Sequence, residues 1–313
     1  MPPDRDGKRV KKIKLINYFM IFKKIFVFFL FFLPGPFLLA QEPEKTVTPE
    51  PVSFKFVALG DSESMKTGFY PEMAQMISLA KKQNPDFAVF TGDIMSTSNR
   101  NISTYHSWVS TFKRIVDAHF NKTYIAFGKH DFDCGFRCVN LWGKILWNRT
   151  WALNEKPKLY HSFDHENTHF VLLASEYPIK RTVDPFQLNW LENDLKNTDK
   201  PNKIVITHVP PITFFEESAK KCHDMSCNKT SRDRLLNILK TYKVDLVISG
   251  HEHSFQHKIK NDTDFIISGN SGNRGRYDLK SEDSFSLIEV KGESITVKKI
   301  NKKEEVKATI KIK

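Results

Sequence analysis

The sequence predicts an α/β layered fold, and two observations carry that prediction. From residue 54 onward, short apolar runs alternate with amphipathic helical patterns, which is typical of sheets covered by helices. The 313 residues are 40% hydrophobic and 27% charged, which is enough for a sizeable core in one large domain or two small ones. This composition excludes collagen-like, coiled-coil and low-complexity chains.

The first 40 residues indicate a secretory signal. A basic stretch leads into the apolar run 25–33, and a small residue, Ala40, precedes Gln41. The alternative is a membrane anchor, but the run 25–40 has 16 residues including two prolines, fewer than the roughly 20 residues of a spanning helix. We therefore expect residues 1–40 to be a signal peptide, with membrane attachment only if it stays uncleaved, and residues 41–53 to be a linker.

The net charge of +12 is concentrated in this N-terminal segment. Residues 1–24 hold eight Lys or Arg against two Asp, which leaves 40 basic against 34 acidic side chains in the rest of the chain. So small a surplus, without a basic helix face or an RNA-binding aromatic motif, predicts no nucleic-acid partner except as a substrate.

Export would place the four cysteines in an oxidising compartment, where disulfides are favoured over metal ligation by thiolates. The pairs that are close in sequence are Cys134 with Cys138 and Cys222 with Cys227, and three connectivities are open.

Apolar residues recur at helical spacing in four segments, which we expect to be helices at about 70–83, 104–117, 185–196 and 232–242. After residue 284, two apolar runs at 284–290 and 294–300 predict a closing β-hairpin. We expect the main domain to cover residues 54–300 and the Lys-rich end, 301–313, to form a basic, solvated edge.

Five of the predicted strands are followed by an Asp or a His. The segments are Gly60-Asp61, Gly92-Asp93, Gly128-Lys129-His130, Thr207-His208 and Gly250-His251. Ligands bind at the carboxyl ends of strands in an open α/β sheet, so we expect these five loops to converge on one site. One such segment has an ordinary explanation as a turn or a buried histidine. Five together predict a first-row divalent metal ion, because clustered carboxylates and imidazoles would otherwise repel one another or stay unsatisfied.

These motifs resemble those of the calcineurin-like metallophosphoesterase superfamily, in particular its exported members related to purple acid phosphatases. The corresponding segments are Asp61-Ser-Glu63, Gly92-Asp93-Ile-Met-Ser96, Gly128-Lys129-His130-Asp131, Thr207-His208 and Gly250-His251-Glu-His253. The resemblance covers about residues 54–300. It implies a four-layer α/β/β/α sandwich of two mixed β-sheets flanked by helices.

The resemblance also implies one or two di- or trivalent metal ions, Fe, Mn or Zn, that activate a water for in-line attack on a phosphate mono- or diester. The implied ligands are Asp93 as a bridge, Asp61 and His253 on the first ion, and His208 and His251 on the second. His130 would bind the phosphate or protonate the leaving oxygen, with Asp131 beside it to fix the imidazole.

The sequence departs from the family pattern at three positions. Glu63 stands where the family has His, and its carboxylate can still ligate but makes the first site more anionic. Ser96 stands at the position of a Tyr, so the iron–tyrosinate colour of purple acid phosphatases is not expected. Lys129 stands where an Asn supplies an amide oxygen to the second ion, and a charged ammonium accepts no bond and repels a cation.

Three interpretations of Lys129 are open. Its charge could take the place of the second cation, it could ligate as a neutral amine after a large fall in pKa, or it could pair with Asp93 or Glu63 in an inactive site. Two functions follow. The first is an exported metal-dependent phosphoesterase with a small-molecule phosphate ester as substrate, expected to be a monomer. The second is a catalytically degenerate protein of the same fold that binds a ligand without turning it over.

Overall fold

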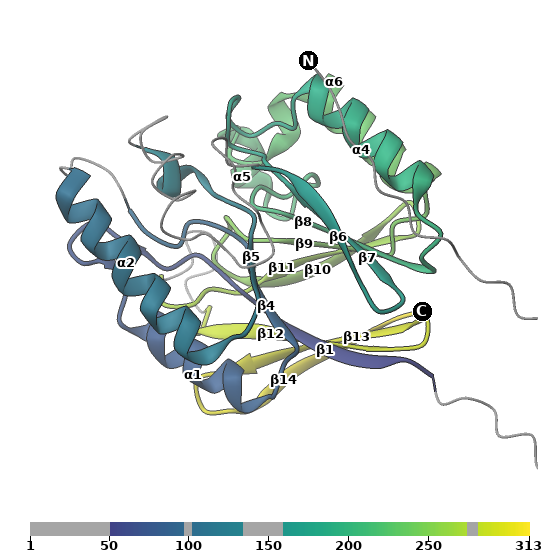
Figure 1. The fold of residues 1–313 in the computed structure, drawn as a ribbon. Helices are drawn as coiled ribbons and strands as arrows, with labels where there is room; N and C mark the ends of the chain where they lie inside the picture. The colour runs from purple at the N-terminus through teal and green to yellow at the C-terminus, as the bar shows by residue number, and fades with distance from the viewer. Residues whose placement is uncertain (1–50, 97–101, 134–158, 274–280) are drawn as a thin grey trace, which may run out of the picture. The chain divides into compact units, whose positions relative to one another are not determined.

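The computed structural model describes residues 51–96, 102–133, 159–273 and 281–313 (Figure 1). The expected signal peptide, most of the expected linker, and the cysteines at 134 and 138 lie outside these ranges. Among the helices of the described ranges, none combines the length and hydropathy that a membrane span requires.

The first sheet has six strands in the order β14-β13-β12-β1-β4-β5. In chain order they are β1 (Ser53–Leu59), β4 (Phe87–Phe90), β5 (Thr123–Ile125), β12 (Ser284–Lys291), β13 (Ser294–Asn301) and β14 (Val306–Ile312). β1, β4 and β5 run parallel, whereas β12, β13 and β14 add as an antiparallel meander. The predicted closing hairpin is confirmed as β12–β13, and the Lys-rich end forms the edge strand β14.

The second sheet also has six strands, in the order β10-β11-β9-β8-β7-β6. In chain order they are β6 (His161–His165), β7 (Thr168–Leu173), β8 (Asn202–Thr207), β9 (Leu246–Ser249), β10 (Phe255–Lys260) and β11 (Thr263–Ser268). The four central strands are parallel, and the two outer strands are antiparallel to their neighbours. Both large sheets are therefore mixed.

All four predicted helices are confirmed. They are α1 (Glu72–Lys82), α2 (Ile102–His119), α4 (Pro185–Asn197) and α6 (Lys229–Thr241). The start of α4 follows from local sequence: the Asp184 carboxylate accepts the N–H groups of Phe186 and Gln187 at 2.9 and 3.2 Å, and Pro185 occupies the first turn.

Several elements were not predicted, among them two short ones. A two-stranded hairpin, β2 (Glu63–Ser64) with β3 (Gly68–Phe69), follows β1, and a short helix, α5 (Glu216–Lys220), precedes α6. The loop between α5 and α6 contains a disulfide between Cys222 and Cys227, which confirms that expected pair.

Three apolar clusters define four layers. One lies between α1, α2 and the outer face of the first sheet, one fills the space between the sheets, and one lies between the second sheet and α4 and α6 (Figure 1). β1 contributes to two of them, because Phe56 and Ala58 face the other sheet while Val57 and Leu59 face the helices. The α/β/β/α sandwich is thereby confirmed.

Candidate metal centre

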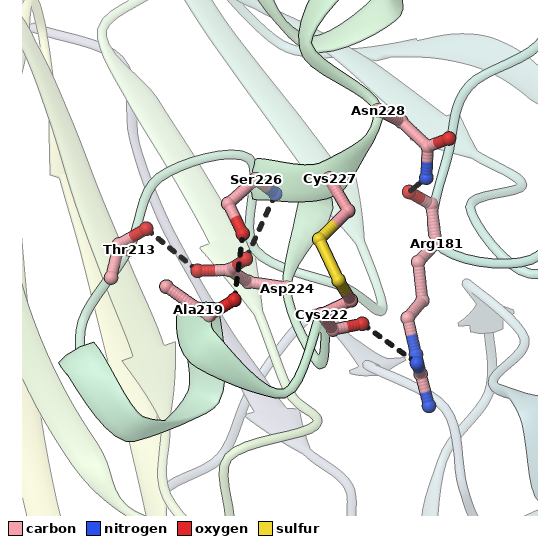
Figure 2. The surroundings of a disulfide bond; sticks show 8 residues. All are labelled: Arg181, Thr213, Ala219, Cys222, Asp224, Ser226, Cys227 and Asn228. Atoms are coloured by element: carbon pink, nitrogen blue, oxygen red, sulfur yellow. Dashed lines mark hydrogen bonds between the residues drawn. A yellow bond between two sulfur atoms is a disulfide. The ribbon is translucent and has the colours of Figure 1, made fainter.

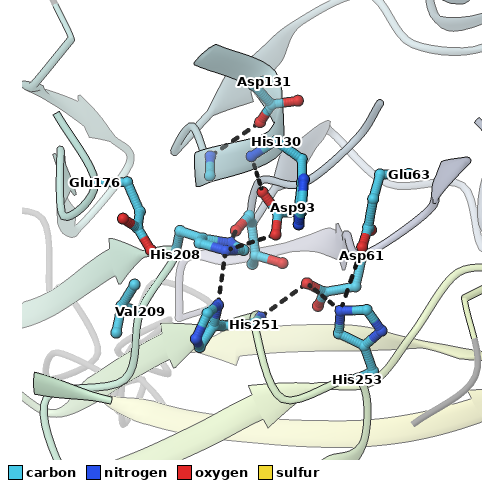
Figure 3. Close-up of polar contacts among 12 residues, drawn as sticks. Asp61, Glu63, Asp93, His130, Asp131, Glu176, His208, Val209, His251 and His253 are labelled. Carbon is cyan, nitrogen blue, oxygen red and sulfur yellow. Dashed lines mark hydrogen bonds and ion pairs between the residues drawn. The ribbon is translucent and has the colours of Figure 1, made fainter. Parts of the chain in front are cut away.

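The polar residues that follow the strands come together at one edge of both sheets (Figure 3). Backbone hydrogen bonds join their loops: Asp61 N–H donates to the Gly92 carbonyl at 3.0 Å, and Gly250 N–H donates to the His208 carbonyl at 3.0 Å. The two sheets meet where His251 N–H donates to the Asp61 carboxylate at 2.8 Å. The expected convergence of the loops is therefore present in the structure.

Four of the expected ligands have a backbone conformation that L-residues rarely adopt. Asp61, Asp93, His251 and His253 have φ angles of 54°, 47°, 73° and 50°. A left-handed conformation costs a non-glycine residue on the order of 1–2 kcal/mol, and such residues cluster at functional sites. Their concentration on these side chains indicates that the strand ends are shaped for ligand binding.

One glycine makes this approach of loops sterically feasible. A Cβ at Gly128 would lie 2.3 Å from Asp93 Oδ1 and 2.5 Å from its backbone nitrogen. The glycine in the predicted Gly-Lys-His segment is thus required because the turn after β5 rests directly on Asp93.

His208 and His251 each turn one ring nitrogen toward the other ring. His208 Nδ1 lies 2.8 Å from the Thr91 carbonyl, and His251 Nε2 lies 2.6 Å from the His223 carbonyl. Carbonyl oxygens only accept, so each of these ring nitrogens carries a proton, and in the neutral form of each ring the other nitrogen keeps a lone pair. Those two nitrogens, His208 Nε2 and His251 Nδ1, are 3.2 Å apart.

A carboxylate oxygen completes this arrangement. Asp93 Oδ2 lies 3.1 Å from His208 Nε2, and donor atoms of Asp93, His208 and His251 all fall within 4.8 Å of one another. Two lone pairs and a carboxylate that face one another need a positive charge between them, either a proton or a metal ion. Imidazole nitrogens backed by carbonyl acceptors form the usual donor set for Zn, Fe or Mn.

The second half of the centre is richer in carboxylates. His253 Nε2 lies 3.7 Å from both Asp61 Oδ1 and Glu63 Oε1. Asp61 Oδ2 and Glu63 Oε2 are buried and have no hydrogen-bond partner among the described residues. Orphaned buried carboxylate oxygens of this kind are satisfied by a cation. The residues present therefore fit one or two di- or trivalent ions.

The protonation behaviour of the carboxylates shows how much negative charge is gathered here. Burial raises the pKa of Asp61 to about 8 and raises that of Glu63 well above its usual range. Burial would also raise the pKa of Asp93, but the charge and the hydrogen bond of His208, together with the charge of His130, hold it well below its usual range. Asp93 is thus the carboxylate that stays ionised among them.

The histidines respond in opposite directions. Burial lowers the pKa of His251 well below its usual value, and the neighbouring His208 adds to that effect. Burial would lower the pKa of His208 as well, but contact with Asp93 raises it to about 10. In the protein without a cation, a proton on His208 therefore occupies the space between the facing nitrogens.

His130 lies beside this cluster. Its backbone N–H donates to Asp93 Oδ1 at 2.8 Å, and donor atoms of Glu63, Asp93 and His130 lie within 4.8 Å of one another. Burial opposes its protonation, but a hydrogen bond to Asp133 and the charges of Asp93 and Glu63 raise its pKa to about 9. The ring is a cation at neutral pH.

The residue that orients this ring is not the expected one. His130 Nδ1 lies 3.0 Å from Asp133 Oδ2, whereas the Asp131 carboxylate accepts the N–H groups of Gly128 at 2.9 Å and Ile94 at 3.0 Å. The cause is the 3-10 turn Lys129–Phe132, in which side chains three residues apart lie on one face. Asp131 instead ties the loops after β4 and β5 together.

Lys129 is half-buried next to His130. In the described part of the chain, the ion pairs of Asp93 and Glu63 are with His208 and His253, and none joins either carboxylate to Lys129. The pairing required by the inactive-site interpretation is therefore not observed.

Two further residues belong to the centre and were missed in the sequence. Glu176 follows β7, is buried, and lies near enough to His208 that this histidine opposes the rise in pKa that burial gives Glu176 (Figure 3). The sequence could have indicated Glu176, because an apolar run precedes it as in the other five strand-end segments. Asn273 donates to Glu63 Oε1 at 2.7 Å, and nothing in its local sequence indicates that contact.

A model of the calcineurin-like phosphoesterase family matches residues 54–255. Purple acid phosphatase 22 of Arabidopsis thaliana is 25% identical over 233 residues, which are 71% of this chain and 48% of the relative. Purple acid phosphatase 23 of the same plant is 29% identical over 135 residues, 40% of this chain and 28% of the relative. The chain thus spans about half or less of the length of these curated relatives.

Solved structures share the fold. The purple acid phosphatase PPD1 from yellow lupin (Lupinus luteus) aligns with a TM-score of 0.68 at 15% identity, covering 84% of this chain and 54% of that one. A dimetal phosphatase from Danio rerio aligns with a TM-score of 0.60 at 16% identity, covering 84% and 99%. GAP50, the anchor in the inner membrane complex of Plasmodium, aligns with a TM-score of 0.59 at 18% identity, covering 83% and 88%.

At these identities the structural likeness shows the fold alone, whereas the family model spans well over half of the 313 residues. Together with the strand-end motifs, that match establishes that the chain belongs to the calcineurin-like phosphoesterase family.

Proposed function

We propose that this chain is an exported, metal-dependent phosphoesterase that hydrolyses a small phosphate mono- or diester. The observation that carries the proposal is the pair of facing ring nitrogens of His208 and His251 beside the ionised Asp93. Side chains arranged in this way lower their free energy when a di- or trivalent cation lies among them. The family membership supports hydrolysis of a phosphate ester as the use of that cation.

The proposed ligands follow the family pattern. Asp93 would bridge two ions, with Asp61, Glu63 and His253 on one side and His208 and His251 on the other. When bound, such ions supply positive charge for the phosphoryl oxygens and lower the pKa of a nearby water. Asn273 would hold the Glu63 carboxylate in place through its 2.7 Å hydrogen bond.

His130 is proposed to act on the substrate directly. Its backbone bond to Asp93 fixes the ring beside the ligands, and Asp133 accepts the Nδ1 proton. The proton on Nε2 is then available to hold a phosphoryl oxygen or to pass to the leaving alkoxide, which leaves poorly without one. Lys129, next to it, is proposed to add positive charge for the phosphate.

The proposal can be tested with the purified full chain. Hydrolysis of p-nitrophenyl phosphate and bis(p-nitrophenyl) phosphate would be measured with Zn²⁺, Mn²⁺ or Fe supplied, for the wild type and for His130→Ala. We expect kcat to fall by about 10²–10⁴-fold in that variant. His106→Ala, a change at an exposed histidine of α2, is the matched control and should leave kcat unchanged. No turnover of either ester with any metal would contradict the proposal.

The location of the protein is a separate part of the proposal. The basic and apolar N-terminal segment supports export, and the Cys222–Cys227 disulfide is typical of an oxidising compartment. N-terminal sequencing of the mature protein should find cleavage after Ala40. An intact N-terminus in the membrane fraction would show an anchored form instead. Light scattering should give the mass of a monomer.

A second function is favoured by two specific residues. Lys129 and Glu63 replace ligands of the family pattern, which is what a retired catalytic site that only binds its ligand would show. Calorimetric binding of a phosphate ester without any hydrolysis would support this function. Metal-dependent turnover abolished by His130→Ala would exclude it.

A further inference from the structure

The backbone carbonyl of His223 determines which nitrogen of His251 is free. It accepts the Nε2 proton at 2.6 Å, so Nδ1 keeps the lone pair that faces His208. A partner of this kind fixes both the tautomer and the ring orientation of a metal-binding histidine. The position of that one carbonyl group therefore controls a proposed ligand, and His223 lies in the short loop closed by the disulfide.

The disulfide loop, residues 222–227, is held in place from several sides (Figure 2). Cys222 adopts a left-handed backbone conformation with φ 52°, which a non-glycine residue keeps only where its surroundings impose it. The disulfide to Cys227 and a hydrogen bond from Arg181 to the Cys222 carbonyl at 2.7 Å impose it here. His223 N–H also donates to the Ser218 carbonyl at 2.8 Å.

Arg181 links the disulfide loop to the rest of the centre. Its backbone N–H donates to the Glu176 carboxylate at 3.3 Å, and its carbonyl accepts from the Asn228 side chain at 2.9 Å, directly after Cys227. Glu176 in turn lies near His208 (Figure 3). Arg181 thus contacts Glu176, which lies near His208. It also contacts Cys222, which directly precedes the residue whose carbonyl accepts from His251.

We propose that the disulfide loop is a positioning element for His251, and that Arg181 is the positioning residue that anchors it. Without the disulfide, Cys222 is free to leave its strained conformation, the His223 carbonyl shifts, and His251 loses its fixed tautomer. Metal binding at Asp93, His208 and His251 then weakens, while the half of the centre formed by Asp61, Glu63 and His253 keeps its geometry. This inference rests on the proposed function, because it presupposes that the centre binds a metal.

The test measures Zn²⁺ affinity by competition with a chromogenic chelator in the full chain. In Cys222→Ser/Cys227→Ser we expect the dissociation constant of the site that includes His251 to rise by about 10–100-fold, the range for loss of a partner behind a metal ligand. Affinity at the other half should change by less than about twofold. Leu239→Ala is the matched control: it lies in α6, outside the disulfide loop, destabilises the same layer of the fold and should leave Zn²⁺ affinity unchanged.

A second variant keeps the disulfide. Arg181→Gln removes the bond to the Cys222 carbonyl and should raise the same dissociation constant by a smaller factor. The ¹⁵N shifts of the His251 ring provide a readout that stability alone would not move: in the metal-free wild type they should show the Nε2–H tautomer, and in the double cysteine variant a mixture of tautomers.

The outcomes separate the two proposals. A wild type that binds neither Zn²⁺ nor any other metal of the hydrolysis assay contradicts the proposed function and this inference with it. A wild type that binds Zn²⁺ without any change at His251, or variants with wild-type affinity and an unchanged tautomer, contradict this inference alone. Equal losses in Leu239→Ala and the cysteine variant would also overturn it, because the effect would then be one of stability.

Discussion

Lys129 is the residue on which we expect the number of metal ions in the centre to depend. It brings an ammonium group to a position where the family has an amide oxygen, and it forms no ion pair with Asp93 or Glu63 among the described residues. Under the proposed function, its charge would act on the cation and the phosphate that the centre binds.

Lys129→Asn should strengthen metal binding at Asp93, His208 and His251 by at least about tenfold, because it removes a positive charge and supplies an oxygen donor. Elemental mass spectrometry and a phosphoesterase assay on the same preparation would measure it. An active wild type with one ion and a variant with two would show that Lys129 replaces a cation. An inert, metal-free wild type and an active variant would instead identify a binding protein on a retired catalytic scaffold.

Asp133 is the residue we expect to set the orientation of His130. Asp133→Asn keeps the size of the side chain but removes the charge behind the imidazole, so kcat should fall by roughly tenfold, less than in His130→Ala. KM should stay near its wild-type value. The same loss in Asp117→Asn, at an exposed carboxylate on α2, would show that the effect is not specific to this contact.

The candidate site was predictable to the level of strand ends but not of side-chain pairs. An Asp or a His directly after an apolar run was sufficient to predict that Asp61, Asp93, His208 and His251 lie together. The choice between Asp131 and Asp133 depended on a short 3-10 turn, in which side chains three residues apart lie on one face. The sequence does not reveal that this turn forms at Lys129–Phe132. Asn273 joins Glu63 across 210 residues, so no local pattern could indicate it.

At the scale of elements, the turn after β5 is held to the loop after β4 by one buried carboxylate. Asp131 accepts hydrogen bonds from Gly128, Ile94 and Met95. Asp131→Ala would leave three buried N–H groups unsatisfied, so the free energy of unfolding should fall by about 3 kcal/mol or more. Urea denaturation would measure it, with Asp117→Ala as the exposed control, expected to change stability by less than about 1 kcal/mol.

A histidine away from the centre joins β6, β7 and α4. His169 Nδ1 lies 2.7 Å from Asp164 and Nε2 lies 2.9 Å from Asp194, which also accepts from Ser162, while Lys200 lies 3.9 Å from Asp164. Burial opposes protonation of His169, but the hydrogen bonds and charges of the two carboxylates raise its pKa. The protonated ring therefore contributes to stability.

The sign of the pH dependence follows from that raised pKa. The contribution of His169 is fully present below the unfolded pKa of about 6.5 and is lost as pH rises through the higher folded pKa. The denaturation midpoint of the wild type should thus fall, relative to His169→Gln, as pH rises above about 6.5. Parallel curves for the two proteins across this range would show that the contact does not contribute.

Element prediction succeeded where local rules agree with packing. α4 has a capping Asp184, a proline in its first turn and an apolar face, and all three predict the same boundary. β6 was missed because its residues are mostly half-buried and polar, so that no alternation of apolar and polar residues marks it. The pair β2 and β3 is too short for any periodic pattern.

At the scale of the whole molecule, the last strand connects the two sheets. β14 pairs with β13 in the first sheet, Ile310 packs in the cluster between the sheets, and Lys313 pairs at 2.5 Å with Asp245, which precedes β9 in the second sheet. Lys82 also pairs with Glu304 just before β14. The Lys-rich end is therefore structural as well as solvated.

Deletion of residues 302–313 should lower the melting temperature by on the order of 10 °C, because a buried isoleucine, a half-buried isoleucine and a sheet edge are lost. The newly exposed edge of β13 should also promote aggregation. Differential scanning calorimetry and light scattering would measure both effects. Lys307→Ala, an exposed change within β14, should alter neither, and an unaffected deletion variant would show that the last strand is dispensable.

The division into two sheets was not accessible from the residue pattern alone. Five strand ends that meet at one edge suggest a single open sheet, yet β1, β4 and β5 belong to one sheet and β8 and β9 to another. Apolar runs buried on both faces look alike whether the second face is covered by helices or by another sheet. The four layers were predicted from the resemblance to a known family and not from the residue pattern.

The ring of Phe170, in the second sheet, packs edge-on against Phe56 and Phe87 of the first, with centroids 5.3 and 5.4 Å apart. Asp61 and Asp93 follow strands of one sheet, and His208 and His251 follow strands of the other. The aromatic rings packed between the sheets therefore contribute to the spacing of these carboxylates and imidazoles. We expect a change of ring size between the sheets to alter the distance between the donor atoms of the centre. The size of ion that fits would then change although no ligand had been replaced.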